Sequence, residues 1–141
     1  MNVIFLDDDP NRQNRMKSVL PCIKQVWTAD EAIEEISKHE HIDAVFLDHD
    51  LGGEVYVDSA CYNTGMTVAR WIAENRAGNS IDHIVIHTFN PVGARNMADS
   101  LHDKFRCKVS VCTFLSGWFN VIVNSLNDRP EAANEEAAKD Q

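Results

Sequence analysis

Five short apolar segments alternate along this chain with segments whose apolar residues recur at helical spacing. The segments expected to form strands are residues 2–6, 24–27, 43–47, 83–88 and 108–113, and each is followed by an expected helix. Strict alternation of this kind is typical of a parallel sheet with helices on both faces. The pattern therefore predicts an α/β protein with a flavodoxin-like, doubly wound, five-stranded parallel sheet in the order 2-1-3-4-5.

Local signals place the starts of the helices. Pro10 suits the first turn of a helix, Thr28–Glu31 forms a capping box, and Asn90 precedes Pro91 as a good N-cap. The last helix is expected from Leu115 to Leu126. Its regular apolar stripe predicts core packing of Leu115, Trp118, Phe119, Ile122, Val123 and Leu126.

One folded domain is expected over residues 1–127. Residues 128–141 carry five acids and two bases with few apolar anchors, so this acidic tail is expected to be frayed or disordered. The oligomeric state does not follow from the sequence.

Composition restricts the function classes. The 141-residue chain has a formal net charge of −9, which argues against general binding to nucleic-acid backbone or to an anionic membrane. No apolar run approaches the ~18 residues of a membrane helix, and no leader is evident at the N-terminus. The four cysteines lack the spacing of a zinc site, so we expect reduced thiols and a cytoplasmic location.

Acidic residues follow two of the expected strands, at the point where each strand ends. Asp7 and Asp8 follow the first strand, and Asp48 and Asp50 flank His49 after the third. These strands are neighbours in the predicted order, so their side chains should converge at the crevice where ligands bind. Clustered carboxylates repel one another unless a cation intervenes, and their oxygens suit Mg²⁺ or Mn²⁺. We therefore predict that Asp7, Asp8, Asp48 and Asp50 bind metal; the alternative is a set of solvated turn carboxylates.

The end of the fourth expected strand carries groups suited to phosphate chemistry. His87 has an unperturbed pKa of about 6.5, which suits proton transfer near neutrality. We predict it as a catalytic residue together with Asp48 and His49; the alternative is a strand histidine satisfied by a backbone carbonyl. Free amides at the start of the next helix make an anion site. The expected phosphate-binding residues are Thr88, Asn90, Val92 and Gly93.

The segment from Asp48 to about Asn63 is expected to be a long loop with two glycines and two tyrosines. Loops of this length in compact domains are often functional lids. Tyr56 and Tyr62 would line the lid or lie on the surface.

From residue 2 to about residue 127 the chain resembles a response-regulator receiver domain. Asp7 and Asp8 match the paired acids of that family, Asp48 matches the phospho-accepting aspartate, and Thr88 matches the hydroxyl residue after the fourth strand. The resemblance implies that the acids bind Mg²⁺ and that Thr88 contacts a phosphoryl group.

The chain departs from the receiver pattern at the fifth strand. Receivers carry a lysine at the end of this strand, whose ammonium binds the phosphoryl oxygens. Here the strand ends in Val111-Cys112-Thr113-Phe114, and Lys108 lies at its opposite end. The usual cation is therefore absent from this position.

Two motifs narrow the resemblance. Leu47–Gly52 reads LDHDLG and His87–Ala94 reads HTFNPVGA. Together they are similar to a divergent group, the cyclic-phosphate-processing receiver domains, whose members are proposed to act on cyclic phosphates in RNA repair. This resemblance implies phosphoester chemistry in place of signal relay.

Three functions follow from these observations. The first is a metal-dependent phosphoesterase acting on a cyclic or terminal phosphate, with a phosphate-containing small molecule or an RNA end as its partner. The second is a stand-alone receiver phosphorylated on Asp48, and the third is a non-catalytic module that binds a phosphorylated ligand. The missing lysine and the added His49 and His87 favour the first. A fourth possible function is an acidic inhibitor that mimics nucleic acid, but an acidic net charge alone does not establish it.

Overall fold

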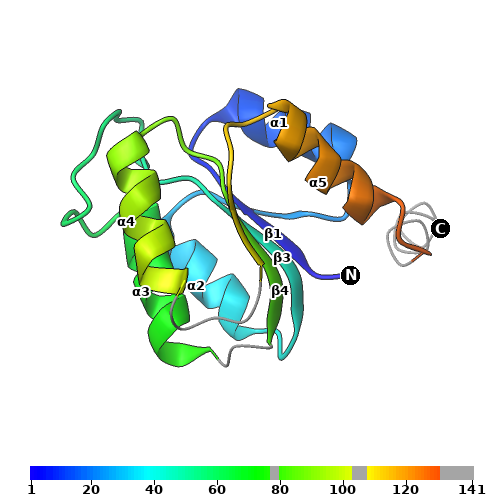
Figure 1. Cartoon of the computed structure of the whole chain (residues 1–141), viewed down its shortest axis with the longest axis horizontal. Helices are drawn as coiled ribbons and strands as arrows, with labels where there is room; N and C mark the ends of the chain where they lie inside the picture. The colour runs from blue at the N-terminus through cyan, green and yellow to red at the C-terminus, as the bar shows by residue number, and fades with distance from the viewer. Residues whose placement is uncertain (77–79, 103–107, 131–141) are drawn as a thin grey trace.

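A computed structural model describes residues 1–76, 80–102 and 108–130, which form a five-stranded parallel sheet between two layers of helices (Figure 1). The sheet order is β2-β1-β3-β4-β5, so the predicted flavodoxin-like fold is confirmed. The strands are β1 (Val3–Leu6), β2 (Lys24–Val26), β3 (Ile42–Leu47), β4 (Ile81–Ile86) and β5 (Lys108–Val111). The helices are α1 (Pro10–Val19), α2 (Ala29–Ser37), α3 (Gly65–Asn75), α4 (Pro91–His102) and α5 (Gly117–Asn127).

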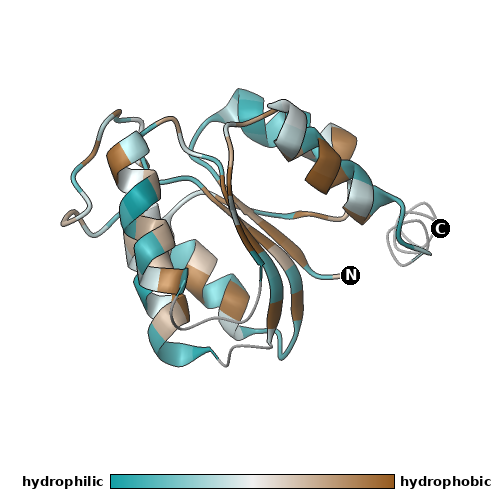
Figure 2. Cartoon of the chain, viewed as in Figure 1, coloured by the Kyte–Doolittle hydropathy of each residue, from teal (hydrophilic) through white to brown (hydrophobic). Residues whose placement is uncertain are grey.

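Helices cover both faces of the sheet, which explains why the central strands are almost continuously apolar. Helices α2, α3 and α4 pack on one face, and α1 and α5 pack on the other (Figure 1). Ile4, Val45 and Ile84 face the first layer, while Phe5 and Phe46 face the second. The strands accordingly appear as the brown centre of Figure 2, with teal concentrated on the outer faces of the helices.

The register of the three central strands brings their carboxyl ends to one level. Leu6 of β1 pairs with Leu47 of β3, and Leu47 pairs with Ile86 of β4. The residues that follow these three positions, Asp7, Asp48 and His87, therefore emerge side by side. This edge of the sheet is where ligands bind in open α/β folds.

Several boundaries differ from the sequence-based expectation. The last helix begins at Gly117 and not at Leu115, because Ser116 is its N-cap and accepts a hydrogen bond from Phe119 N–H, while Leu115 has φ 59°. Trp118, expected in the core, is 48% exposed and lies under the ammonium of Lys108, 5.0 Å from its ring centre. Strand β4 ends at Ile86, so His87 and Thr88 follow it.

Residues 131–141 of the expected acidic tail lie outside the described residues. Within the described ranges, no helix is long and apolar enough to cross a membrane.

Candidate active site

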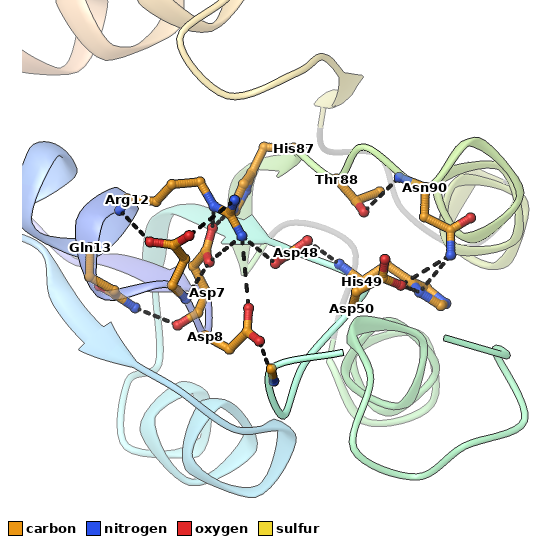
Figure 3. A network of polar contacts seen from close by, with 12 residues as sticks. Asp7, Asp8, Arg12, Gln13, Asp48, His49, Asp50, His87, Thr88 and Asn90 are labelled. Atoms are coloured by element: carbon orange, nitrogen blue, oxygen red, sulfur yellow. Dashed lines mark hydrogen bonds and ion pairs between the residues drawn. The ribbon is translucent and has the colours of Figure 1, made fainter. Parts of the chain in front are cut away.

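A cavity of about 320 Å³ opens at the carboxyl edge of the sheet. It lies between the β1–α1 turn, the ends of β3 and β4, and the loop after β3, and its lining includes Asp8, Arg12, Asp48, Gly53, Thr88 and Phe89. Figure 3 shows most of these side chains with the polar contacts that surround them. The cavity brings together acids that are 40 residues apart in sequence, as the strand order predicts.

Asp7 is fully buried, and its carboxylate is saturated by hydrogen bonds. Arg12 binds it twice, with Nε 2.8 Å from Oδ2 and Nη2 3.0 Å from Oδ1. The Asp9 N–H donates to Oδ1 at 2.9 Å, and His87 Nε2 lies 3.1 Å from Oδ2. Burial raises the pKa of Asp7, but the bonds from His87 and Arg12 outweigh it and hold the pKa below its ordinary value. Asp7 is thus an ionised anchor for Arg12.

Arg12 also faces the other acids of the site. Its Nη2 lies 3.8 Å from Asp8 Oδ1 and 3.6 Å from Asp48 Oδ2. The local sequence of α1 fixes this position, because Asp9 caps the helix by accepting the N–H groups of Asn11 and Arg12. A guanidinium in the first turn of α1 is therefore directed back to the end of β1.

Asp48 is buried among the other acids of the site, and its two oxygens have different surroundings. Its Oδ1 accepts the His49 N–H at 2.8 Å, whereas its buried Oδ2 has no hydrogen-bond partner in the part of the chain that the structure describes. Burial, followed by the nearby charge of Asp7, raises the pKa of Asp48 to about 8, despite the opposing charge of Arg12. The site thus has an oxygen poised for a cation or a proton.

The loop after β3 reaches back to the cavity. Gly53 N–H donates to Asp8 Oδ2 at 2.6 Å, and Gly52 and Gly53 adopt φ values of 77° and 79°. These left-handed conformations favour glycine, because a Cβ would clash with the backbone. The glycines thereby let the loop turn across the acids.

Three of the predicted metal ligands converge. Asp7, Asp8 and Asp48 each offer an oxygen, and these atoms lie within 4.8 Å of one another. With all groups ionised, three carboxylates (−3) and the Arg12 guanidinium (+1) sum to −2, the charge that one divalent cation balances. Asp7 is already saturated with hydrogen bonds. The best-placed ligands for such a cation are therefore Asp8 and the Oδ2 of Asp48, which has no hydrogen-bond partner among the described residues. The donor set therefore fits a hard divalent cation.

The fourth predicted ligand, Asp50, is not part of this cluster, although it borders the cavity. Its oxygens accept the N–H groups of Tyr56 and Val57 and the amide of Asn90. These bonds and the one from His49 outweigh burial and keep the pKa of Asp50 below its ordinary value. The carboxylate is used to hold the loop.

His87 lies behind Asp7 and does not line the cavity. It is 1% exposed, stacks on Phe5 with ring centres 4.8 Å apart, and also contacts Phe46, Phe114 and Phe119. Burial lowers its pKa more than the bond to Asp7 raises it. In the alternative to a catalytic role the partner of His87 was a backbone carbonyl, but the structure places the Asp7 carboxylate there, so a catalytic role for His87 has to act through Asp7.

His49 points away from the acidic cavity, toward the loop and α4 (Figure 3). Its Nδ1 lies 2.9 Å from Asp50 Oδ1 and its Nε2 lies 2.9 Å from Ser59 Oγ. Successive side chains at a strand end alternate in direction. This alternation explains why Asp48 and its neighbour His49 point to different parts of the structure.

The predicted phosphate-binding residues divide between two places. Thr88 lines the acidic cavity, and its Oγ1 accepts the Asn90 N–H, which leaves the hydroxyl proton for a ligand. Asn90, Val92 and Gly93 instead line a second cavity, and the Gly93 N–H is already bonded to Asn90 Oδ1 at 2.9 Å. The expected amide site at this helix start is therefore turned away from Asp48.

Arg12 is the functional candidate that sequence reasoning missed. Its signal was its spacing, because residues four apart on a helix are neighbours and Arg12 follows Asp8 by four. Ser59 was missed as well, and no spacing rule links it to His49.

Comparisons with known proteins identify the family of this chain. A sequence model of the family described as cyclic-phosphate processing receiver domain matches residues 2–103, more than half of the chain. No curated protein matches the chain significantly. The chain therefore belongs to the cyclic-phosphate processing receiver domain family.

Solved structures of response regulators share the fold. The N-terminal domain of a response regulator/sensory box/GGDEF protein from Carboxydothermus hydrogenoformans is 13% identical, with full coverage of both chains and a TM-score of 0.60. The BeF3-activated receiver domain of DrrB is 14% identical over 89% of this chain and 93% of its own, with a TM-score of 0.56. The Mn²⁺-bound form of response regulator Rcp1 is 10% identical over 89% and 91%, also with a TM-score of 0.56.

Proposed function

We propose that this member of the cyclic-phosphate processing receiver family hydrolyses a cyclic phosphate ester in its acidic cavity with Mg²⁺ or Mn²⁺. One observation carries the proposal: Asp48, whose buried Oδ2 has no hydrogen-bond partner among the described residues, lines a cavity together with Asp8, Arg12 and Thr88. Such a site pairs oxygen ligands for a hard cation with donors for a phosphate. The family description supports the substrate class.

Asp8 and Asp48 would hold the cation, with Asp7 behind them. When bound, a divalent cation polarises a phosphoryl oxygen and stabilises the negative charge that develops during hydrolysis. The chain's own donors act on the same charge: the Arg12 guanidinium faces the cavity, and the Thr88 hydroxyl has its proton available. Charge-assisted bonds from arginine to phosphate oxygens are among the strong hydrogen bonds of proteins.

His87 has a different role here from the general acid expected from the sequence. Because its Nε2 contacts Asp7 Oδ2 and it does not line the cavity, it acts as a positioning residue. It fixes the carboxylate that in turn holds Arg12 over Asp48. Its catalytic effect would then be indirect and would travel through Asp7.

The cavity favours the terminal phosphate of a small ligand over a long nucleic acid. Its volume of about 320 Å³ lies at the lower end of the range for small-molecule sites. Phe89 is 59% exposed on its wall and offers a face on which a base can stack. The net charge of −9 disfavours contacts to further phosphates along a chain. The partner we propose is a cyclic-phosphate nucleotide or the end of an RNA.

The test is hydrolysis of 2′,3′-cyclic nucleotides and of short RNA ending in a cyclic phosphate, with Mg²⁺, with Mn²⁺ and with chelator. We expect metal-dependent turnover that Asp48→Asn and Asp8→Asn abolish. Asp99→Asn, on an exposed position of α4, is the matched control. Absence of turnover with both metals across this panel would refute the proposal, and tight binding without turnover would favour a phosphate-binding module.

The second candidate is a phospho-accepting receiver, which the contact between Arg12 and Asp48 favours. The cation missing from β5 is partly replaced by this guanidinium, 3.6 Å from Asp48 Oδ2. We nevertheless expect weak phosphorylation, because Arg12 is engaged by Asp7 through two hydrogen bonds. Intact mass after acetyl phosphate treatment distinguishes the two: a stoichiometric adduct, absent from Asp48→Ala, would establish signalling.

A further inference from the structure

We propose that Ser59, His49 and Asp50 form a second catalytic site, a serine–histidine–aspartate relay that cleaves a neutral carboxylic ester. The relay lies between the loop after β3 and the start of α4. It does not rest on the proposed phosphoesterase function, because neither His49 nor Ser59 lines the acidic cavity.

The three side chains lie in the order that such a relay needs. Ser59 Oγ is 2.9 Å from His49 Nε2, and His49 Nδ1 is 2.9 Å from Asp50 Oδ1. With the proton on Nδ1, where the Asp50 carboxylate can accept it, the lone pair of Nε2 faces the serine hydroxyl. This is the arrangement in which an imidazole removes the proton from a nucleophilic serine.

The relay is held rigidly. His49 is fully buried, and a Cβ added to Gly93 would overlap its ring, so the first turn of α4 packs directly on the imidazole. The backbone N–H groups of Tyr56 and Val57 donate to Asp50 at 2.7 and 3.1 Å. Fixed geometry of this kind lowers the cost of reaching a reactive arrangement.

Ser59 opens on a cavity of its own, of about 330 Å³. The cavity is lined by Tyr56, Asn90, Val92 and Asn96 among others, and Asp58 is the one charged residue among its described lining. A lining that holds a carboxylate and no base disfavours a phosphate or carboxylate ligand. A small uncharged ester suits a cavity with this lining.

The start of α4 supplies a positive potential at the same place. Asn96 Nδ2 donates to Ser59 Oγ at 2.9 Å and so holds the serine oxygen in position before an ester binds. Val92 belongs to the first turn of the 12-residue α4, whose positive dipole end faces the cavity. Donors fixed near developing negative charge are a principal source of catalysis in acyl transfer.

The reaction is balanced by water alone. Ser59 Oγ forms a bond to the ester carbonyl carbon while its proton passes to His49 Nε2. The bond to the alkoxide then breaks, and the alcohol leaves with that proton. Water attacks the acyl-serine, gives its proton to His49 Nε2, and the carboxylic acid departs as the Ser59 hydroxyl is restored.

The experiment uses a fluorophosphonate probe and p-nitrophenyl butyrate on the full chain. We expect one probe adduct on the peptide that contains Ser59, and ester turnover at least about 10²-fold above that of Ser59→Ala. Ser18→Ala, at an exposed serine of α1, should match wild type in both assays. Absence of an adduct, or an adduct that persists in Ser59→Ala, would overturn the proposal.

Two further variants separate chemistry from folding. His49→Gln removes the proton acceptor, and Asp50→Asn removes the carboxylate that positions it. Both should slow probe labelling at Ser59 by about 10-fold or more, because general bases contribute ~10²–10⁴ in rate. If either variant melts below wild type, labelling is compared at equal fractions folded. Labelling at the wild-type rate in His49→Gln would show that the three residues only fasten the loop.

Discussion

The Arg12 guanidinium lies 3.6 Å from Asp48 Oδ2, so helix α1 supplies to this aspartate a cation that the end of β5 lacks. The same guanidinium makes two hydrogen bonds to Asp7. Arg12 therefore links the two acidic segments that the parallel sheet brings together. In the metal-free protein it is the main neutralising charge, which makes it the natural place to begin testing the site.

Arg12→Ala should destabilise the metal-free protein by about 2–4 kcal/mol, because removing one partner of a buried ion pair leaves a buried charge uncompensated. Added Mg²⁺ should then raise the melting temperature of the variant more than that of wild type, since binding to the folded state alone stabilises it. Thermal melts with chelator and with Mg²⁺ measure both effects.

Arg15→Ala is the control for this substitution, since Arg15 lies exposed on the same helix. It should change neither the melting temperature nor the Mg²⁺ response. If Arg12→Ala and Arg15→Ala behaved alike, the guanidinium would have no part in balancing the acids.

Asp48→Asn should stabilise the chelated protein, and more so as the pH rises. The pKa of Asp48 is raised to about 8, above the ~3.9 of an unfolded chain. The folded state therefore holds a proton that the unfolded state releases, and stability falls between about pH 4 and pH 8. At pH 8 we expect a gain of about 1–3 kcal/mol, since relaxation reduces the full value of ~1.4 kcal/mol per pKa unit.

Urea unfolding of the two proteins across this pH range measures the effect. Saturating Mg²⁺ should reverse the order, because the cation stabilises the ionised carboxylate of wild type only. Parallel stability curves for wild type and Asp48→Asn in chelator would show that Asp48 has an ordinary pKa.

The sheet and its acidic edge followed from the sequence because they depend on short-range patterns. Apolar runs identified the central strands, and each acid was placed by the strand that precedes it. The convergence of Asp7, Asp8 and Asp48 then required only the strand order. The predicted helix boundaries were less accurate than the strand order where a single N-cap residue decides the boundary, as Ser116 does for α5.

The direction of each side chain was not predictable in the same way. His49 and Asp50 adjoin Asp48 in sequence, yet they bond to Ser59 and to the loop backbone. These partners belong to a long loop whose sequence has no hydrophobic periodicity, so no sequence pattern predicted these contacts. Likewise, His87 packs into an aromatic cluster built from β1, β3 and the segment around α5, a relationship that depends on the folded chain.

Gly93→Ala should destabilise the protein by about 1–3 kcal/mol, the usual cost of overpacking. An added methyl would overlap the ring of His49, which is buried and cannot move aside without breaking its bonds to Asp50 and Ser59. Gly117→Ala is the matched control, because a Cβ there meets nothing within 4 Å. Chemical unfolding of both variants gives the comparison, and equal stabilities would mean that α4 and His49 are not in contact.

The tautomer of His87 decides between the two roles considered for it. Its pKa is lowered by burial, so we expect a neutral imidazole at pH 7 that donates from Nε2 to Asp7 and leaves Nδ1 unprotonated. A long-range ¹H–¹⁵N spectrum of the chelated protein reports this directly, with His87→Phe identifying the signal. A ring that is neutral at pH 7 and titrates below the ordinary histidine pKa of ~6.5 is not a proton donor near neutrality, and His87 then acts by holding Asp7. An imidazolium at pH 7 would contradict the expected shift and restore the general-acid role that the sequence suggested, because the ring would then carry a proton across the pH range in which phosphate esters are processed.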